Sequence, residues 1–277
     1  MKYFFYRLLG FFIGILPVPI FYTLAEYVGK TAYIFWGKRR KIGMENLKKA
    51  FPEKSNQELK IILEKTFINF SYTFFEIFKQ PYVKNNIDNI FRVKGLENLE
   101  TAYSDGKGVI LVTAHFGNWE LAGSFICSLG YKLGVIQKTQ KNTDFDRLIN
   151  YYRTLNNIKP IGRKTALKDG IKALKNGEIL GIIADQKANT SGIISDFFGI
   201  LAKIMLLFVR LYLKFKRPIV FVVPKRTGQM KFEVDFIEKY EPECDNIEEI
   251  TQYINDRLES FIRETPEQWF WPHNRWG

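Results

Sequence analysis

Two residues of this 277-residue chain, His115 and Glu120, have the types and spacing needed to activate a hydroxyl group. His115 ends the apolar run 109–114 and is one of only two histidines, and the Glu120 carboxylate follows five residues later. A neutral imidazole can accept a proton near physiological pH, and a nearby carboxylate can fix its tautomer and stabilise the imidazolium. No serine or cysteine motif competes for the role of nucleophile.

The two side chains can meet only if the backbone turns between them. On one continuous helix, residues five apart lie about 140° apart around the axis and would face away from each other. Phe116-Gly117 must therefore form a turn, and Asn118 must cap a helix that carries Glu120 in its first turn. A buried histidine without a catalytic role is the alternative reading of the same pattern.

Apolar strand-like runs alternate with helical runs through most of the chain, which predicts an α/β sheet flanked by helices. His115 and Asp185 both come at the carboxyl end of a predicted strand, where ligands of such sheets usually bind. The predicted strands are 109–113, 132–136, 179–184, 219–223 and 231–237, and the predicted helices are 118–129, 144–156, 164–176 and 247–264, the third of them ended by Gly177.

A further helix is predicted from a capping box at Ser55-Asn-Gln-Glu58 and runs over 60–79. It carries more aromatic side chains than one core-facing stripe requires. These residues either pack in the core or line, in part, a groove for a hydrocarbon chain. They are Phe67, Phe70, Phe74, Phe75 and Phe78.

The composition favours an anionic lipid partner and disfavours several other classes. The formal charge is +12, and the 25 phenylalanines and 14 tyrosines are typical of proteins that work at a membrane interface. No zinc-finger or RNA-binding signature appears, so nucleic acid is not expected. Two histidines cannot form a histidine-rich metal centre, and no metal is predicted. Cys127 and Cys244 cannot form a disulfide framework, which favours a cytosolic catalytic part.

Residues 1–40 are predicted to be a hydrophobic membrane anchor, followed by a catalytic domain over 41–277. A spanning helix needs about 20 apolar residues, which 8–28 nearly supplies. Pro17 and Pro19 interrupt this run, and a bent pair of short helices in one leaflet explains them better. The basic cluster 38–41 places this end on the cytoplasmic side.

Several ordered motifs resemble the late acyltransferases of lipid A biosynthesis, within the glycerolipid-acyltransferase-like superfamily with a His-x4-Asp/Glu motif. The resemblance covers nearly the whole chain and implies a mixed sheet flanked by helices. The motifs are Asn46-Leu47 with Phe51-Pro-Glu53, His115 to Glu120, Gly162-Arg163, Asp185-Gln186, Phe197-Phe-Gly199, and Pro266-Glu-Gln-Trp-Phe-Trp271 with His273-Asn-Arg-Trp276.

The resemblance implies transfer of a fatty acyl chain from an acyl-carrier-protein thioester to a hydroxyl of a phosphorylated glycolipid, a lipid A precursor, at the bacterial inner membrane. The catalytic domain would face the cytoplasm, and no cofactor would be needed. His115 would be the general base, Glu120 would orient it, and Arg163 would face the charge developing on the thioester carbonyl. The implied substrate contacts are Asn118, Asp185, Gln186 and Arg275. Asp185-Gln186 could equally be a strand cap that hydrogen-bonds to neighbouring loops, and the C-terminal segment with its tryptophans favours a packed tail.

One segment departs from the family pattern. After Phe197-Phe-Gly199 the family usually has small, threonine-rich residues, whereas this chain has Ile204-Met-Leu-Leu-Phe-Val209. We expect this run to belong to a helix with Lys203, Arg210 and Lys214 on one face, either a core helix or a second membrane contact.

Three other functions remain open at this point. The acceptor could be an aminolipid or another glycolipid. The same histidine and carboxylate could activate water and make the protein an acyl-thioester hydrolase. The chain could also be a lipid-binding protein without catalytic activity.

Overall fold

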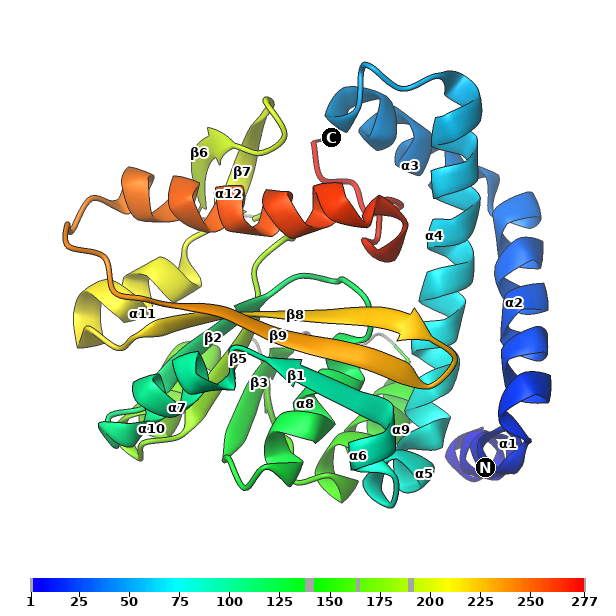
Figure 1. Ribbon diagram of the computed structural model, residues 1–277, viewed down its shortest axis with the longest axis horizontal. Coiled ribbons are helices and arrows are strands. Elements are labelled where there is room, and N and C mark those ends of the chain that lie inside the picture. The colour runs from blue at the N-terminus through cyan, green and yellow to red at the C-terminus, as the bar shows by residue number, and fades with distance from the viewer. Residues whose placement is uncertain (1, 138–141, 163–164, 189–191, 277) are drawn as a thin grey trace.

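A mixed β-sheet forms the centre of the molecule. The computed structural model describes residues 2–137, 142–162, 165–188 and 192–276. Within these ranges the strand order of the main sheet is β1-β9-β8-β2-β5-β3-β4, and β8 and β9 are antiparallel while the other neighbours are parallel. The predicted mixed α/β sheet is confirmed (Figure 1). The strands are β1 Phe91–Lys94, β2 Val109–Thr113, β3 Leu133–Gln137, β4 Lys159–Gly162, β5 Ile179–Ile183, β8 Ile219–Gly228 and β9 Lys231–Tyr240.

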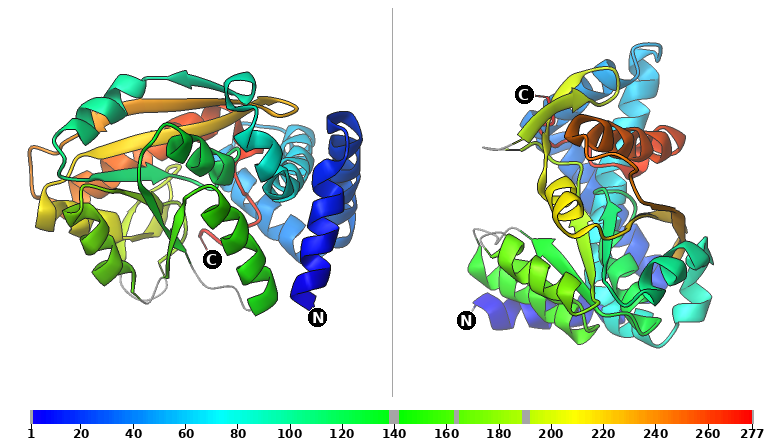
Figure 2. Two further views of the ribbon diagram at one scale, coloured as in Figure 1. Left: turned by 90° about the horizontal axis from the view of Figure 1, so that it is seen from below. Right: turned by 90° about the vertical axis from the view of Figure 1, so that its left-hand side faces the viewer.

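Helices cover both faces of the sheet, as Figure 2 shows. Successive residues of β2 alternate between two buried clusters: Ile110 and Val112 pack on one face, and Val109 and Leu111 on the other. A strand buried on both faces has a continuous apolar sequence, which is why 109–113 lacks alternation. The larger helices are α4 Asn56–Glu76, α7 Leu96–Ser104, α8 Trp119–Ser128, α9 Thr143–Leu155, α10 Ala166–Lys175, α11 Leu207–Phe215 and α12 Ile247–Glu264, with η1 Ile77–Lys79, α5 Gln80–Lys84 and α6 Ile87–Ile90 leading from α4 to β1.

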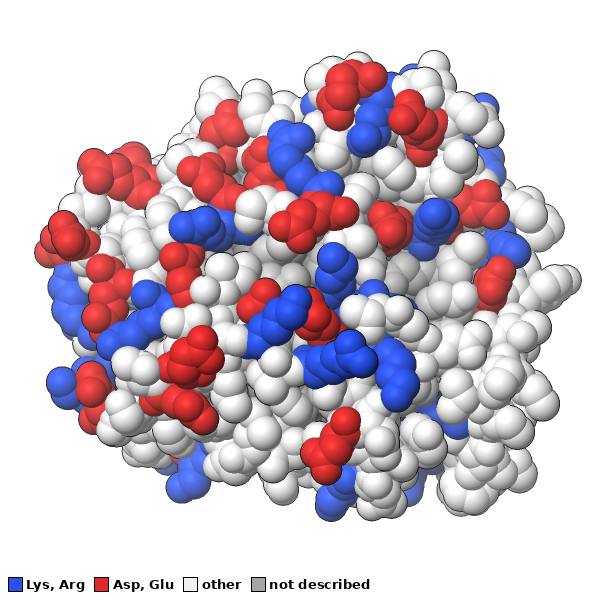
Figure 3. Space-filling model, viewed as in Figure 1, with Lys and Arg blue, Asp and Glu red and all other residues white. Residues whose placement is uncertain are grey.

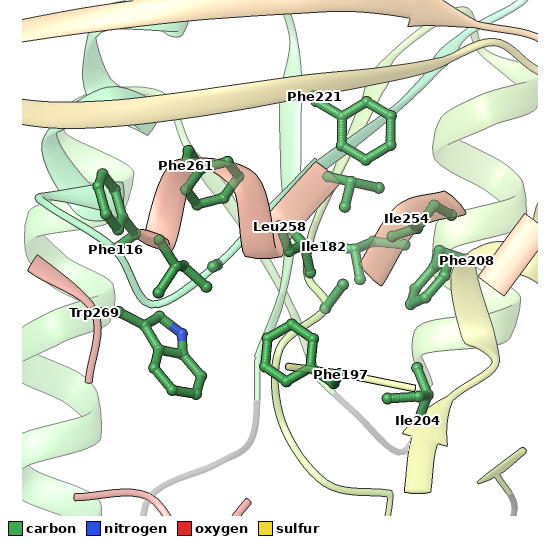
Figure 4. Packing of buried hydrophobic residues seen from close by; sticks show 14 of the residues in the cluster. Phe116, Ile182, Phe197, Ile204, Phe208, Phe221, Ile254, Leu258, Phe261 and Trp269 are labelled. Atoms are coloured by element: carbon green, nitrogen blue, oxygen red, sulfur yellow. The ribbon is translucent and has the colours of Figure 1, made fainter. Parts of the chain in front are cut away.

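The loop after β2 is packed against α12 and the C-terminal segment. Phe116 is buried, and its ring centroid lies 5.1 Å from that of Phe261 on α12. Figure 4 shows these two rings as neighbours, with Trp269 close to Phe116. The C-terminal segment, including the 3₁₀ turn η2 Pro266–Gln268, therefore supports the loop that carries His115.

The N-terminal segment forms two helices, α1 Lys2–Ile15 and α2 Val18–Phe35, followed by α3 Gly37–Ala50. The predicted break is confirmed: Pro17 caps α2, and Pro19 lies in its first turn, where a missing N–H costs no helical hydrogen bond. α2 runs beside α4 (Figure 1), and the helices approach so closely that a Cβ at Gly29 would lie 2.6 Å from the Cα of Ile68. None of the described helices has the length and apolar character needed to cross a membrane.

The strands and helices predicted from periodicity are present, with shifts of a few residues at their ends. The prediction of one helix around Ile204–Val209 is wrong. Ile204 lies on β7 (Leu201–Met205), which pairs with β6 (Gly192–Asp196) in a separate hairpin, and α11 begins only at Leu207. A short apolar run has no clear period, so it predicts strand and helix equally well. Lys203 is consequently on a strand, and only Arg210 and Lys214 are on the helix.

Candidate active site

The pairing of β2 with β5 brings His115 and Asp185 together. The strands are parallel, and Thr113 at the end of β2 is in register with Ile183 at the end of β5. His115 and Asp185 each follow two residues later. The sequence places both at strand ends, but the contact itself depends on the two strands being neighbours, which no local pattern reveals.

Asp185 holds the His115 ring from one side. Its Oδ1 lies 2.8 Å from Nδ1 of His115, and its Oδ2 accepts hydrogen bonds from the His115 backbone N–H (2.9 Å) and from the Trp269 indole (2.7 Å). Burial alone would raise the pKa of Asp185, but the charge and hydrogen bonds of His115 and the indole N–H outweigh it and lower the pKa to about 2. The carboxylate is therefore ionised, and Nδ1 of His115 carries a proton.

The other ring nitrogen of His115 faces the surface. The Gln186 side-chain nitrogen lies 3.3 Å from Nε2, and the Gln186 side chain is exposed. A proton on Nδ1 leaves Nε2 as an acceptor in the neutral ring. His115 lines a narrow crevice of about 160 Å³ with Phe70, Trp119 and Phe270. A hydroxyl that approaches Nε2 of the neutral ring would meet an unprotonated nitrogen.

The predicted turn between His115 and Glu120 is confirmed. Gly117 has φ +54°, and a Cβ there would lie 1.7 Å from the carbonyl oxygen of Pro224, so only glycine fits. Asn118 caps α8, with its Oδ1 accepting from the Leu121 N–H at 2.8 Å. The side chain of Asn118 is completely buried. The sequence predicts it also as a substrate contact, but its polar atoms are used inside the protein.

Glu120 lies in the first turn of α8, as predicted, but its carboxylate contacts Arg153 of α9 and not the His115 ring. Arg153 Nε donates to Glu120 Oε2 at 2.8 Å, its Nη2 donates to Oε1, and the Trp119 indole donates to Oε1 at 3.2 Å. The prediction that Glu120 orients the His115 ring is therefore wrong, and Asp185 is the carboxylate that contacts the ring. The reason is position, because His115 and Asp185 each follow the end of one of two paired strands by two residues, whereas the Glu120 side chain on α8 is held by Arg153 of α9.

Glu120 nevertheless remains electrostatically coupled to His115. Burial would raise the pKa of Glu120, but Arg153 above all, with Trp119 and the charge on His115, lowers it overall. Glu120 is therefore a buried, ionised carboxylate near His115 that does not contact the ring.

An apolar groove begins beside Glu120 and Arg153 and runs between α8 and the sheet. It holds about 590 Å³ of empty space, part of it open to solvent. Trp119 lines both the groove and the crevice at His115. The ring centroids of Trp119 and His115 lie 5.0 Å apart. Glu120 and Arg153 line the groove, and its other walls are apolar side chains such as Leu111, Ile126, Leu133 and Ile158.

Of the two further predicted site residues, Arg163 lies outside the described residues, and Arg275 does not face the site. Arg275 is only 1% exposed, with its Nη1 donating to the carbonyl of Lys203 at 3.2 Å and its guanidinium over the Phe197 ring. It therefore packs in the core beneath the site, and burial lowers the pKa of Arg275 to about 10.

Arg153 and Trp269 are functional candidates that sequence reasoning missed. Arg153 lies on the predicted helix 144–156, where a basic residue is ordinarily solvated. Trp269 belongs to the C-terminal motif, which pointed to a packed tail and not to a donor for Asp185. Among the described residues, no group of three or more His, Cys, Asp or Glu side chains is arranged to hold a metal ion.

The chain is similar to known proteins along its whole length. The pattern of the family of bacterial lipid A biosynthesis acyltransferases matches residues 1–277. The lipid A biosynthesis lauroyltransferase of Escherichia coli is 28% identical over 268 residues, which is 94% of this chain and 86% of the relative. The palmitoleoyltransferase of the same organism is 24% identical over 264 residues with the same coverage. A phosphatidylinositol mannoside acyltransferase of Mycobacterium tuberculosis is 25% identical over 133 residues, 45% of this chain and 42% of the relative.

Proposed function

Since the chain belongs to the family of bacterial lipid A biosynthesis acyltransferases and is an acyltransferase, we propose that it moves a fatty acyl chain from an acyl-carrier-protein thioester to a hydroxyl of a lipid A precursor. The observation that carries this proposal is the orientation of His115. Asp185 holds Nδ1 and so leaves Nε2 as the proton acceptor, and the ring lines a crevice that shares Trp119 with an apolar groove.

The proposed reaction needs no covalent intermediate on the enzyme. Nε2 of His115 takes the proton of the acceptor hydroxyl as its oxygen attacks the thioester carbon. The carbon–sulfur bond then breaks, and the imidazolium returns the proton to the leaving thiolate. The products are an ester and the free thiol of the carrier. Asp185 stabilises the imidazolium by direct contact and Glu120 stabilises it through space, as in a triad without a protein nucleophile.

The groove under α8 is the proposed site of the acyl chain. Its apolar walls would cover the hydrocarbon, and the thioester would lie at the Trp119 end, beside His115. Phe70 contributes to the crevice at His115, whereas Phe67 and Phe75 pack in the core. Arg163 keeps its proposed role toward the carbonyl oxygen, on the basis of the family motif alone.

The N-terminal helices are the proposed membrane contact. Large apolar side chains on α1 and α2 are exposed, and the lower right-hand edge of the molecule in Figure 3, where α1 and the start of α2 lie, shows almost no charge. We define this apolar face by the exposed residues Phe4, Phe5, Leu8, Leu9, Phe11, Phe12, Ile15, Ile20, Leu24, Tyr27, Val28, Ile34, Phe35 and Trp36. The basic residues 38–41 follow on α3. An apolar face bordered by cations suits one leaflet of an anionic membrane, with the site on the cytoplasmic side of the inner membrane.

The acceptor class is tested by mass spectrometry of the products. Purified protein, acyl carrier protein loaded with a C12 to C14-type chain and a tetra-acyl, sugar-capped lipid A precursor are expected to give an acceptor heavier by one acyl group. His115→Ala should abolish the gain. No gain on the acceptor would contradict the proposal.

Two alternatives have their own outcomes in that assay. Loss of the thioester without an acceptor would indicate a hydrolase that uses the same histidine. Acylation of a mannosylated phosphatidylinositol in place of the lipid A precursor would favour another glycolipid acceptor, the activity named for the mycobacterial relative.

A further inference from the structure

A buried ion pair lies directly behind the turn that separates His115 from Glu120. Glu76, at the end of α4, has no exposed surface, and Arg226 of β8 has a side chain that is 8% exposed. Arg226 Nη2 donates to Glu76 Oε2 at 2.6 Å and its Nε to Oε1 at 3.1 Å. Burial would lower the pKa of Arg226, but the Glu76 carboxylate outweighs it and raises the pKa overall. Arg226 is therefore charged within the protein interior.

This pair is hydrogen-bonded to the turn itself. Asn118 Nδ2 donates to Glu76 Oε2 at 2.5 Å, while its Oδ1 caps α8. Thr73, one helical turn before Glu76, donates to the Gly117 carbonyl at 2.7 Å and accepts from Arg226. Gly117 and Asn118 are thus both hydrogen-bonded to side chains of α4.

The pair is also hydrogen-bonded to α2, the helix that carries part of the apolar face. The Tyr22 hydroxyl donates to Glu76 Oε1 and accepts from the Met230 N–H at 2.8 Å. Burial first, and then the Glu76 charge, raises the pKa of the Tyr22 hydroxyl far above its ordinary value, so it remains a donor. A continuous chain of hydrogen bonds therefore runs from α2 through Glu76 and Asn118 to the first turn of α8.

We propose that Glu76 is a positioning residue: through Asn118 it sets the turn that places His115 and Glu120, and through its hydrogen bond with Tyr22 it couples this placement to α2. The proposal rests on the proposed function. Replacing a buried ion pair by apolar residues is often neutral for stability, whereas its hydrogen bonds fix the groups around it in one arrangement. A displacement of about 1 Å at a reacting group can cost about 100-fold in rate.

A matched pair of tyrosines makes the coupling testable. Tyr22 and Tyr72 pack against each other with ring centroids 4.8 Å apart, but the Tyr72 hydroxyl donates to Glu26 and not to Glu76. Tyr22→Phe and Tyr72→Phe each delete one hydroxyl from the same aromatic contact. Only the first shortens the chain of hydrogen bonds that leads to Asn118.

Two measurements separate positioning from simple stabilisation. In steady-state acyl transfer, Tyr22→Phe should lower kcat about 3- to 10-fold and Glu76→Gln about 100-fold, with the KM for the acyl donor within about 2-fold of wild type. Hydrogen exchange of the peptide 116–123 should become faster in Tyr22→Phe while β2 and β5 keep their protection. Tyr72→Phe removes a different hydrogen bond between α4 and α2, one that does not lead to Glu76, and it should match wild type in both measurements.

The outcomes are distinct. Unchanged kcat and unchanged exchange of 116–123 in Tyr22→Phe would overturn the proposal, and so would a uniform rise in exchange with kcat unaltered. If Glu76→Gln does not fold, the two tyrosine variants decide the question. Hydrogen exchange needs no substrate, so it tests the coupling independently of acyl transfer. If exchange of 116–123 rises selectively in Tyr22→Phe but the wild-type protein transfers no acyl chain, the coupling is supported and the proposed function is refuted.

Discussion

At the scale of single residues, the site depends on which carboxylate reaches His115. Asp185 lies at a strand end in register with His115, and its hydrogen bond to Nδ1 leaves Nε2 to accept a proton. Glu120 is the acidic residue of the sequence motif, yet its carboxylate is held by Arg153. Local spacing predicts the turn and its cap correctly, because these depend on Gly117 and Asn118 alone. It cannot predict Asp185 as the partner, because that contact joins residues 70 positions apart.

Replacing Asp185 with asparagine tests its role as the ring's partner. The amide keeps the shape but removes the charge, and it can hold the ring in the wrong tautomer. In a serine hydrolase triad this change costs about 10⁴-fold in kcat. We expect Asp185→Asn to lower kcat at least about 100-fold, with little change in the KM for the acyl donor. Glu120→Gln should cost less, since it acts through space. Equal activity of Asp185→Asn and wild type would rule out the contact as catalytic.

The same aspartate should leave a signature in acid unfolding. Its pKa is about 2 in the folded protein, against about 3.9 in an unfolded chain. A lowered folded pKa contributes stability above the unfolded value, and this stability is lost as the pH falls toward 2. The loss should amount to about 2 kcal/mol. Urea unfolding of wild type between pH 5 and pH 2 should therefore show a steeper decline than that of Asp185→Asn. Parallel declines would contradict the assignment.

At the scale of elements, α8 has two tasks. Its first turn carries Glu120, and its apolar side forms a wall of the groove. The sequence predicted α8, its cap and its neighbouring strands, because each has a strong local period or capping signal. It did not predict the β6–β7 hairpin, whose pairing partners are specified by contacts between strands and not by the pattern of either one.

Gly123 of α8 offers a test of the proposed acyl groove. A Cβ there would project toward Ile158 Cδ1 at 3.0 Å and Leu133 Cδ2 at 3.5 Å, both at the groove wall. Alanine favours a helix over glycine by about 1 kcal/mol, which offsets the small shift that Ile158 must make. We expect Gly123→Ala to fold normally and to favour shorter acyl chains over longer ones by about 10-fold or more in kcat/KM. Competition between carrier-bound chains of two lengths measures this ratio, and an unchanged ratio would place the chain elsewhere.

At the scale of the whole molecule, the apolar face and the site are parts of one packed structure. α2 is tightly packed on α4 at Gly29, and α4 supplies Phe70 to the crevice and Glu76 to the turn. The prolines predicted the break between α1 and α2 because proline acts locally. The packing of α2 on the catalytic part could not be predicted, because an apolar segment of this length suits a membrane and a protein core equally well.

Membrane attachment through the apolar face is tested with vesicles and a matched surface change. Phe11 and Phe12 of α1 are 58% and 55% exposed, and inserting one phenylalanine into a bilayer contributes about 1.5 to 3 kcal/mol. Phe11→Glu with Phe12→Glu should weaken sedimentation with phosphatidylglycerol-containing vesicles by about 100-fold or more. Leu167→Glu on α10, where the side chain is 55% exposed, adds charge outside this face and should leave binding intact.

Raising the salt concentration should weaken the binding of wild type only in part, because the basic residues 38–41 are screened and the apolar contact is not. Binding that survives the double change but disappears in high salt would mean that the cations hold the membrane, and that the exposed rings of α1 do not enter it.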